Sequence, residues 1–198
     1  MKTQIKFQKI LSLSSLIVAA IAFVYALCFF SGNLSDLMWY IGTKQDGYFV
    51  AADSFLVPAQ GMINTMVYMC VIFFVVIAFI YITSTNSRRN YYITNYIMIG
   101  IVMAYALMIA VYGFIMIFSL LNLFYALDWE AIADWYSQTA AEGAPEVDQS
   151  IYMFIIGIVV YVIVLLDVLA WAYNLVWKIK LMKGEKELLS KGFVKEVA

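Results

Sequence analysis

The sequence predicts an all-α integral membrane protein with four transmembrane helices, and three observations lead to this prediction. Apolar residues make up 65% of the chain and charged residues only 13%, whereas soluble domains are roughly 45–50% apolar and about 25% charged. Four apolar windows are each long enough to cross a hydrocarbon core of roughly 30 Å as a helix. The charged residues lie between and beyond these windows, with the exception of Asp167.

The four expected helices cover residues 10–31, 62–84, 93–127 and 151–177, approximately. Two longer connections, 32–61 and 128–150, and a tail, 178–198, complete one transmembrane domain over residues 1–198. A lysine-containing start before an apolar run is also typical of a signal peptide. The first window is longer than the roughly 7–15 apolar residues of such a peptide, and no cleavage signal follows it. We therefore expect a retained membrane anchor.

The distribution of lysine and arginine predicts the orientation in the membrane. Basic residues occur in the N-terminal segment, in the link between the second and third windows and in the tail, whereas the two longer connections contain only Lys44. Because basic segments stay in the cytoplasm, we expect both termini and the short link there, and the longer connections outside. The expected location is the plasma membrane, or the cytoplasmic membrane of a bacterium.

The two outer connections are acidic, and the second has helical spacing. Asp128 is a suitable N-cap for a short amphipathic helix that follows it, and the stretch "NLSDLMWYI" in the first connection suggests a similar helix. Aromatic and acidic side chains of the second connection make it a candidate interaction surface. The candidates are Trp129, Asp134, Trp135 and Tyr136.

Small residues follow a three- and four-residue spacing on two of the expected helices. Such stripes let membrane helices approach each other closely. Tight packing within the bundle explains them, and docking against another subunit is the alternative. The stripe on the first helix includes Ser15, Ala19, Ala22 and Ala26, and the third helix contributes Gly100 and Ala104.

Asp167 is a carboxylate in the middle of the apolar run "YVIVLLDVLAW". It precedes Lys178 by 11 residues, which places it about 16 Å along a helix from that charge. A central aspartate costs about 2.5–3.5 kcal/mol on insertion scales, and the cost falls when the group is protonated or hydrogen-bonded. No lysine or arginine lies inside the four windows, so the partner of Asp167 must be neutral, water, an ion or another chain. Counting helical rise, Tyr105 is the nearest hydroxyl, and Asn174 shares the face of Asp167.

Three roles for this intramembrane polar site remain open at this stage. Asp167 can lock the helices together through a hydrogen bond, pair with a basic residue of a partner membrane protein, or bind a proton or cation during transport. Buried ionisable groups in membrane segments are functional-site candidates by default.

The sequence favours a non-catalytic protein. It contains no histidine, no nucleotide-binding loop, no metal-ligand cluster and no soluble domain, so we expect no enzyme activity, cofactor, metal or nucleic-acid partner. The outer carboxylates Asp128, Glu130 and Asp134 suit a solvated helix face better than a catalytic site. The first hypothesis is an accessory or assembly subunit of a larger membrane complex, docking through helix faces and acidic aromatic outer loops. The alternative is a small homo-oligomeric transporter or channel that uses Asp167 for proton or cation coupling.

Overall fold

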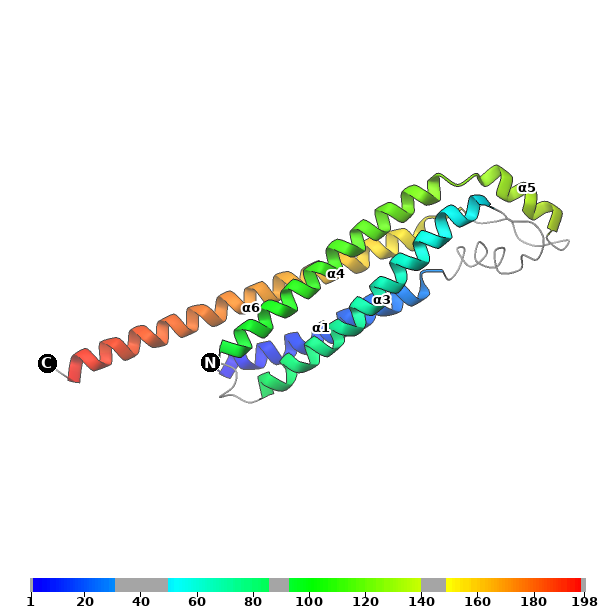
Figure 1. Ribbon diagram of the computed structural model, residues 1–198. Coiled ribbons are helices and arrows are strands. Elements are labelled where there is room, and N and C mark those ends of the chain that lie inside the picture. Colours follow the sequence, from blue (N-terminus) through cyan, green and yellow to red (C-terminus); the bar gives the residue numbers. More distant parts are fainter. Residues whose placement is uncertain (1, 31–49, 86–92, 140–148, 197–198) are drawn as a thin grey trace. The chain divides into compact units, whose positions relative to one another are not determined.

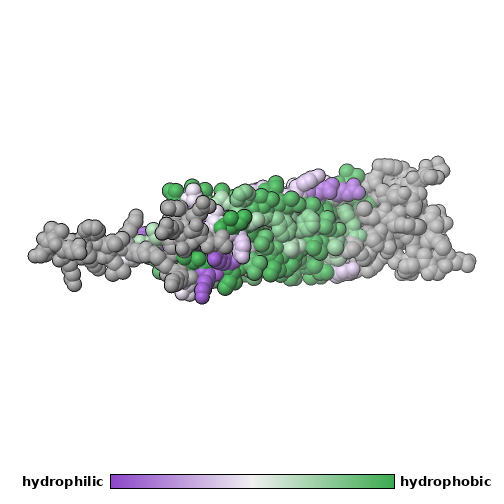
Figure 2. Space-filling model, turned by 90° about the horizontal axis from the view of Figure 1, so that it is seen from below, coloured by the Kyte–Doolittle hydropathy of each residue, from purple (hydrophilic) through white to green (hydrophobic). Residues whose placement is uncertain are grey.

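A computed structural model describes residues 2–30, 50–85, 93–139 and 149–196, and all regular secondary structure in them is α-helical (Figure 1). Four helices are long and apolar enough to cross a membrane, which confirms the predicted fold class. Hydrophobic residues dominate the described surface in Figure 2. The helices are α1 (Lys2–Cys28), α3 (Val50–Thr85), α4 (Ile93–Tyr125), α5 (Trp129–Thr139) and α6 (Tyr152–Glu196).

Three helices are longer than the apolar windows that predicted them. Helix α1 begins at Lys2 instead of near residue 10, α3 begins at Val50 instead of near residue 62, and α6 continues through the tail to Glu196. The prediction that residues 50–61 belong to a loop is therefore wrong. Hydropathy locates the apolar stretch that fits into lipid. The helical backbone can extend beyond this stretch into more polar residues. Even Pro58, which removes one helical hydrogen bond, lies inside α3.

The short helix predicted after Asp128 is present as α5. The backbone N–H of Ala131 donates to Asp128 Oδ1 at 3.0 Å, which is the N-cap arrangement that satisfies an otherwise unpaired donor of the first turn. The helix suggested by "NLSDLMWYI" lies outside the described residues. The position of α5 on the outer side of the membrane stays a prediction.

The chain forms two compact units, and each long helix contributes one segment to each unit. Unit 1 comprises Met1–Ala19, Ile72–Met108 and Ile163–Ala198, and unit 2 comprises Ala20–Val71 and Ile109–Val162. The basic residues are concentrated in one unit, because every lysine and arginine except Lys44 falls within the ranges of unit 1.

The core of unit 2 contains a cluster of aromatic rings among aliphatic side chains. Tyr25 makes edge-to-face contacts with Tyr161 and Phe29, at centroid distances of 5.8 and 6.1 Å. Phe154 continues the cluster, 5.6 Å from Phe29 and 5.3 Å from Phe124. Pairs at these distances contribute about 0.5–1.5 kcal/mol each beyond their buried area, so these rings stabilise the packing of unit 2.

Two glycines of unit 2 make room for tyrosine side chains. A Cβ atom at Gly113 would overlap the ring of Tyr161, and one at Gly157 would overlap the hydroxyl of Tyr25. The missing side chain at Gly157 lets Tyr25 Oη reach the backbone, where it donates to the carbonyl of Met153 at 3.0 Å. The hydroxyl of Tyr161 is buried and has no hydrogen-bond partner among the described residues.

Candidate functional site: a buried polar cluster in unit 1

The interior of unit 1 differs from that of unit 2 because it contains polar side chains beside the hydrophobic ones. All eight buried polar or charged residues in the described part of the chain belong to unit 1. Burying such groups costs free energy unless they find hydrogen-bond partners, and most of them do so here. They are Gln4, Gln8, Ser12, Ser15, Asn95, Asp167, Asn174 and Lys178.

Asp167 is 6% exposed and lies about midway along the membrane-spanning stretch Tyr152–Gly184 of α6. Its partner is Ser15 of α1, whose hydroxyl oxygen lies 2.8 Å from Asp167 Oδ1. The indole N–H of Trp171 donates to the same serine oxygen at 2.8 Å. A serine hydroxyl has one proton to donate and can also accept, so Ser15 joins the carboxylate and the indole of α6 to α1.

Of the partners that the sequence left open for Asp167, the structure shows a neutral group of the same chain, and this group is Ser15 and not Tyr105. The ring of Tyr105 is stacked on Phe73 at 6.5 Å, with 9° between the planes. The depth count failed because it treats helices as parallel rods and ignores tilt and side-chain direction. Ser15, which the sequence suggested only as a packing residue, fills the role. The second carboxylate oxygen, Oδ2, is buried without a hydrogen-bond partner in the described structure.

Lys178 anchors the second part of the cluster and is fully buried. Its ammonium group donates to Asn95 Oδ1 of α4 and lies 3.5 Å from Gln8 Oε1 of α1. It also lies 4.6 Å from the centre of the Tyr96 ring, within range of a cation–π interaction. Lys178 therefore connects three helices.

The amides around Lys178 complete the network. Gln8 Nε2 donates to Asn95 Oδ1 at 3.0 Å, and Gln4 Nε2 lies 3.2 Å from Gln8 Oε1 and 3.0 Å from Asn174 Oδ1. Asn174 was predicted to share the face of Asp167, and it belongs to this amide network. Its Nδ2 group is buried without a partner among the described residues. The face of α6 that contacts α1 thus presents one unpaired acceptor, on Asp167, and one unpaired donor, on Asn174.

Sequence analysis did not consider Gln4, Gln8, Asn95 or Lys178 for the cluster, and it treated Ser12, like Ser15, only as a small packing residue. The signal was available as spacing, because Gln4, Gln8, Ser12 and Ser15 recur at steps of three or four residues, as do Asp167, Trp171, Asn174 and Lys178. Such steps place side chains on one helix face. The glutamines and Lys178 were assigned to the flanks of the membrane segments, so they were not considered as interior residues.

The small residues divide into two groups. Ala19, Ala22 and Ala26 are buried at 1% exposure each, so packing within the chain accounts for them. Gly100 and Ala104 of α4 are exposed, and a Cβ atom at Gly100 would meet no atom within 4 Å. This pair has no packing role within the described structure.

The candidate interaction residues of the second connection are only partly described. Trp129 packs edge-to-face on Phe124 at 4.8 Å, so at least part of its ring is used within unit 2. Asp134 is exposed on α5. Trp135 and Tyr136 lie in the same helix, and their side chains fall outside the described residues.

The cluster offers carboxylate, amide, hydroxyl and ammonium groups for hydrogen bonding. Among the residues that the structure describes, no three histidine, cysteine, aspartate or glutamate side chains lie close enough together to hold a metal ion. The unpaired oxygen of Asp167 can accept a hydrogen bond or a proton. No protein-family model, curated protein or solved structure matches this chain.

Proposed function

We propose that the chain is a non-catalytic accessory or assembly subunit of a larger membrane complex, docked through the outward face of α4 around Gly100 and Ala104. The observation that carries the proposal is an exposed pair of small residues with open space at the glycine. At Gly113 and Gly157 tyrosines of the same chain occupy the space of a Cβ atom, whereas at Gly100, as at Gly61 and Gly184, a Cβ atom would meet nothing within 4 Å. Of these three glycines, only Gly100 is followed by an alanine four residues later, and Ala104 is exposed as well. A small pair spaced by four residues permits close approach of a second helix.

The neighbours of this pair define the chemistry of the partner. Exposed apolar side chains flank it: Ile97 is 56% exposed, Ile101 40% and Met108 44%. Helix α4 contains no charged residue and is a candidate membrane span. The fitting occupant is therefore an apolar transmembrane helix of another protein, with its own small residue opposite Gly100.

The cluster around Asp167 supports this proposal in a different way. Ser15 and Trp171 enclose the carboxylate within the chain, so it is not exposed for pairing with a basic residue of a partner. The hydrogen bonds of the cluster between helices favour one helix arrangement over others, although Oδ2 of Asp167 and Nδ2 of Asn174 have no partner in the described structure. In this role the cluster holds α1, α4 and α6 in the geometry that presents the docking face.

Site-specific photocrosslinking in intact membranes tests the docking face. A photoreactive amino acid at Ile97 should capture a distinct membrane protein, whereas one at the equally lipid-accessible Leu169 of α6 should not. Gly100→Leu should abolish the adduct, and Gly61→Leu is the matched control because Gly61 is also an exposed helical glycine with nothing within 4 Å of its Cβ position. Adducts that survive Gly100→Leu, or that contain only a second copy of this chain, would overturn the proposal.

A transporter or channel is the second candidate, and the unpaired Oδ2 of Asp167 favours it. An acid midway along a membrane span that retains a free acceptor can bind and release a proton or cation. Proton flux into liposomes containing the purified protein, with a pH-sensitive dye inside, tests this. Flux should be lost in Asp167→Asn and kept in Asp134→Asn, which changes an exposed carboxylate of α5. Absence of flux in the unmodified protein would eliminate this candidate.

The orientation proposed with either function places both termini in the cytoplasm and residues 128–150 outside the plasma membrane. Its support is the sequence, because the lysines and arginines other than Lys44 fall within the ranges of unit 1. Labelling intact cells with a membrane-impermeant maleimide tests it, after Cys28 and Cys70 have been replaced by serine. A cysteine at Asp134 should be labelled, and one at Lys191 should be labelled only after the cells are lysed.

A further inference from the structure

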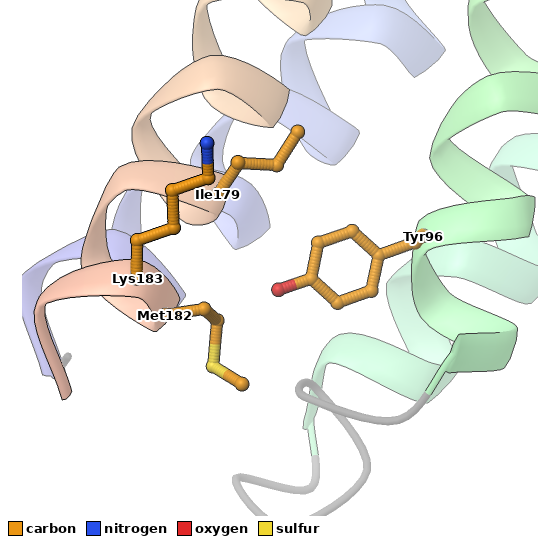
Figure 3. A pocket seen from close by; sticks show the side chains of 4 residues that line it. All are labelled: Tyr96, Ile179, Met182 and Lys183. Carbon is orange, nitrogen blue, oxygen red and sulfur yellow. The ribbon is translucent and has the colours of Figure 1, made fainter. Parts of the chain in front are cut away.

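A groove of about 290 Å³ opens between α4 and α6 within unit 1 (Figure 3). Four of the described residues line it: Tyr96 from α4, and Ile179, Met182 and Lys183 from α6. The figure shows the hydroxyl of Tyr96 directed across the groove towards Met182. This volume matches the lower end of the range of small-molecule sites, roughly 300–1,000 Å³.

The groove combines two kinds of surface. Lys183 contributes an ammonium group and Tyr96 a phenolic hydroxyl, both of which donate hydrogen bonds. Ile179 and Met182 contribute apolar surface. A ligand that fits must therefore carry an anionic oxygen group next to a hydrocarbon portion, as an acidic phospholipid does at the junction of its headgroup and acyl chains.

Two further observations support a lipid ligand. The ring of Tyr96 is held by the ammonium group of Lys178, 4.6 Å from its centroid, so its hydroxyl is positioned before any ligand arrives. Ile179 belongs to a series of exposed apolar side chains on α6 that includes Val176, at 51% exposure, and Leu169, at 58%. Acyl chains can lie along these side chains while the headgroup occupies the groove.

We propose that this groove binds the headgroup of an anionic phospholipid, with Lys183 and Tyr96 contacting the phosphate and Ile179 with Met182 contacting the start of the acyl chains. The charge of the groove agrees with such a ligand, because Lys183 lines it and basic pockets between membrane helices bind acidic headgroups. The site does not depend on the docking of α4 to a partner.

Native mass spectrometry of the full chain in a mild detergent tests the site. Phosphatidylglycerol and phosphatidylcholine with the same acyl chains are titrated separately, and the first should bind more tightly. Lys183→Gln should weaken the first phosphatidylglycerol binding step about fivefold, as expected for one lysine near a lipid phosphate. Tyr96→Phe should weaken it by a smaller factor, about threefold, for the loss of one hydrogen bond.

Lys180→Gln is the matched control, because Lys180 is an exposed lysine of α6 that does not line the groove. It should leave the first binding step unchanged, and circular dichroism should show that all three variants retain their helices. Equal weakening by Lys180→Gln would show a diffuse charge effect and overturn the proposal. Equal binding of the two lipids, or displacement of phosphatidylglycerol by millimolar inorganic phosphate, would overturn it as well, the latter by identifying a free-phosphate site.

Discussion

Replacing Ser15 with alanine tests the connection between α1 and α6 most directly. The hydroxyl of Ser15 lies 2.8 Å from both Asp167 Oδ1 and Trp171 Nε1, so Ser15→Ala leaves an acceptor and a donor of α6 without their partner. Ser12→Ala is the matched control. Ser12 is equally buried, but its hydroxyl bonds only to the carbonyl of Gln8 in its own helix, at 2.8 Å.

The expected cost follows from the two lost contacts between helices. The third contact of the Ser15 hydroxyl, with the carbonyl of Leu11 at 2.9 Å, lies within α1 and corresponds to the one that Ser12→Ala removes. Hydrogen bonds between membrane helices contribute about 0.6 kcal/mol each on average, which sets a lower limit of about 1 kcal/mol for the pair. Leaving a buried polar group unsatisfied costs about 1–3 kcal/mol, which sets an upper limit of roughly 6 kcal/mol for two groups. Because one acceptor is a carboxylate, which forms stronger hydrogen bonds than a neutral group, we expect Ser15→Ala to lower the free energy of unfolding by about 2–3 kcal/mol.

Denaturant unfolding in detergent micelles, followed by far-ultraviolet circular dichroism, measures this free energy. Ser12→Ala should change it by about 0.5 kcal/mol or less, because alanine is the better helix former by a similar amount. A double-mutant cycle with Trp171→Phe should show coupling of about 1 kcal/mol, since contacting residues are not additive. Equal effects of Ser15→Ala and Ser12→Ala would refute the assignment of Ser15 as the partner of Asp167.

The same unfolding assay checks three other expectations. Gly113→Ala should destabilise by about 1–3 kcal/mol through overlap with Tyr161. Gly100→Ala has open space at its Cβ position and should be neutral or stabilising, because alanine is the better helix former. Similar values for the two would contradict the described packing. Tyr25→Phe should cost about 0.5–1.5 kcal/mol for its lost hydrogen bond. Tyr161→Phe should be neutral or stabilising, because the hydroxyl of Tyr161 has no partner in the described structure. The reverse order would show that the hydroxyl of Tyr161 has a partner. Asp128→Ala should cost about 0.5–2 kcal/mol through loss of the cap of α5, and hydrogen exchange should quicken in the first turn of that helix only.

Composition and hydropathy were sufficient to predict the four membrane helices, because lipid imposes a strong requirement on length and polarity. The bounds were less accurate where the helix and the apolar stretch differ. Helix α3 begins at Val50, although the stretch around Asp53 and Gln60 is too polar to be recognised as a membrane segment. The backbone of these residues continues the helix without any signal in a hydropathy window.

The sequence predicted a polar site around Asp167 inside the membrane segments, but not the residues that contact this side chain. The sequence indicated that Asp167 is buried. Because no basic residue lies within the four windows, it left a neutral group, water, an ion or another chain as the partner. It did not identify Ser15, because that requires the tilt and rotation of α1 against α6. The burial of Lys178 was missed because a lysine at the end of an apolar run is normally assigned to the membrane surface, where its charge stays hydrated.

The two candidate functions place different demands on the free oxygen of Asp167. In an assembly subunit the oxygen is incidental, so Asp167→Asn, which keeps an acceptor for Ser15, should leave docking through Gly100 intact even if it lowers stability. In a transporter the oxygen binds the transported ion, so the same substitution removes activity from a protein that still inserts and folds. Because Ser15→Ala disturbs the opposite oxygen of the same carboxylate, it should lower stability in both cases. The comparison of Ser15→Ala with Asp167→Asn therefore separates a structural carboxylate from an ion-binding one, without knowledge of the partner.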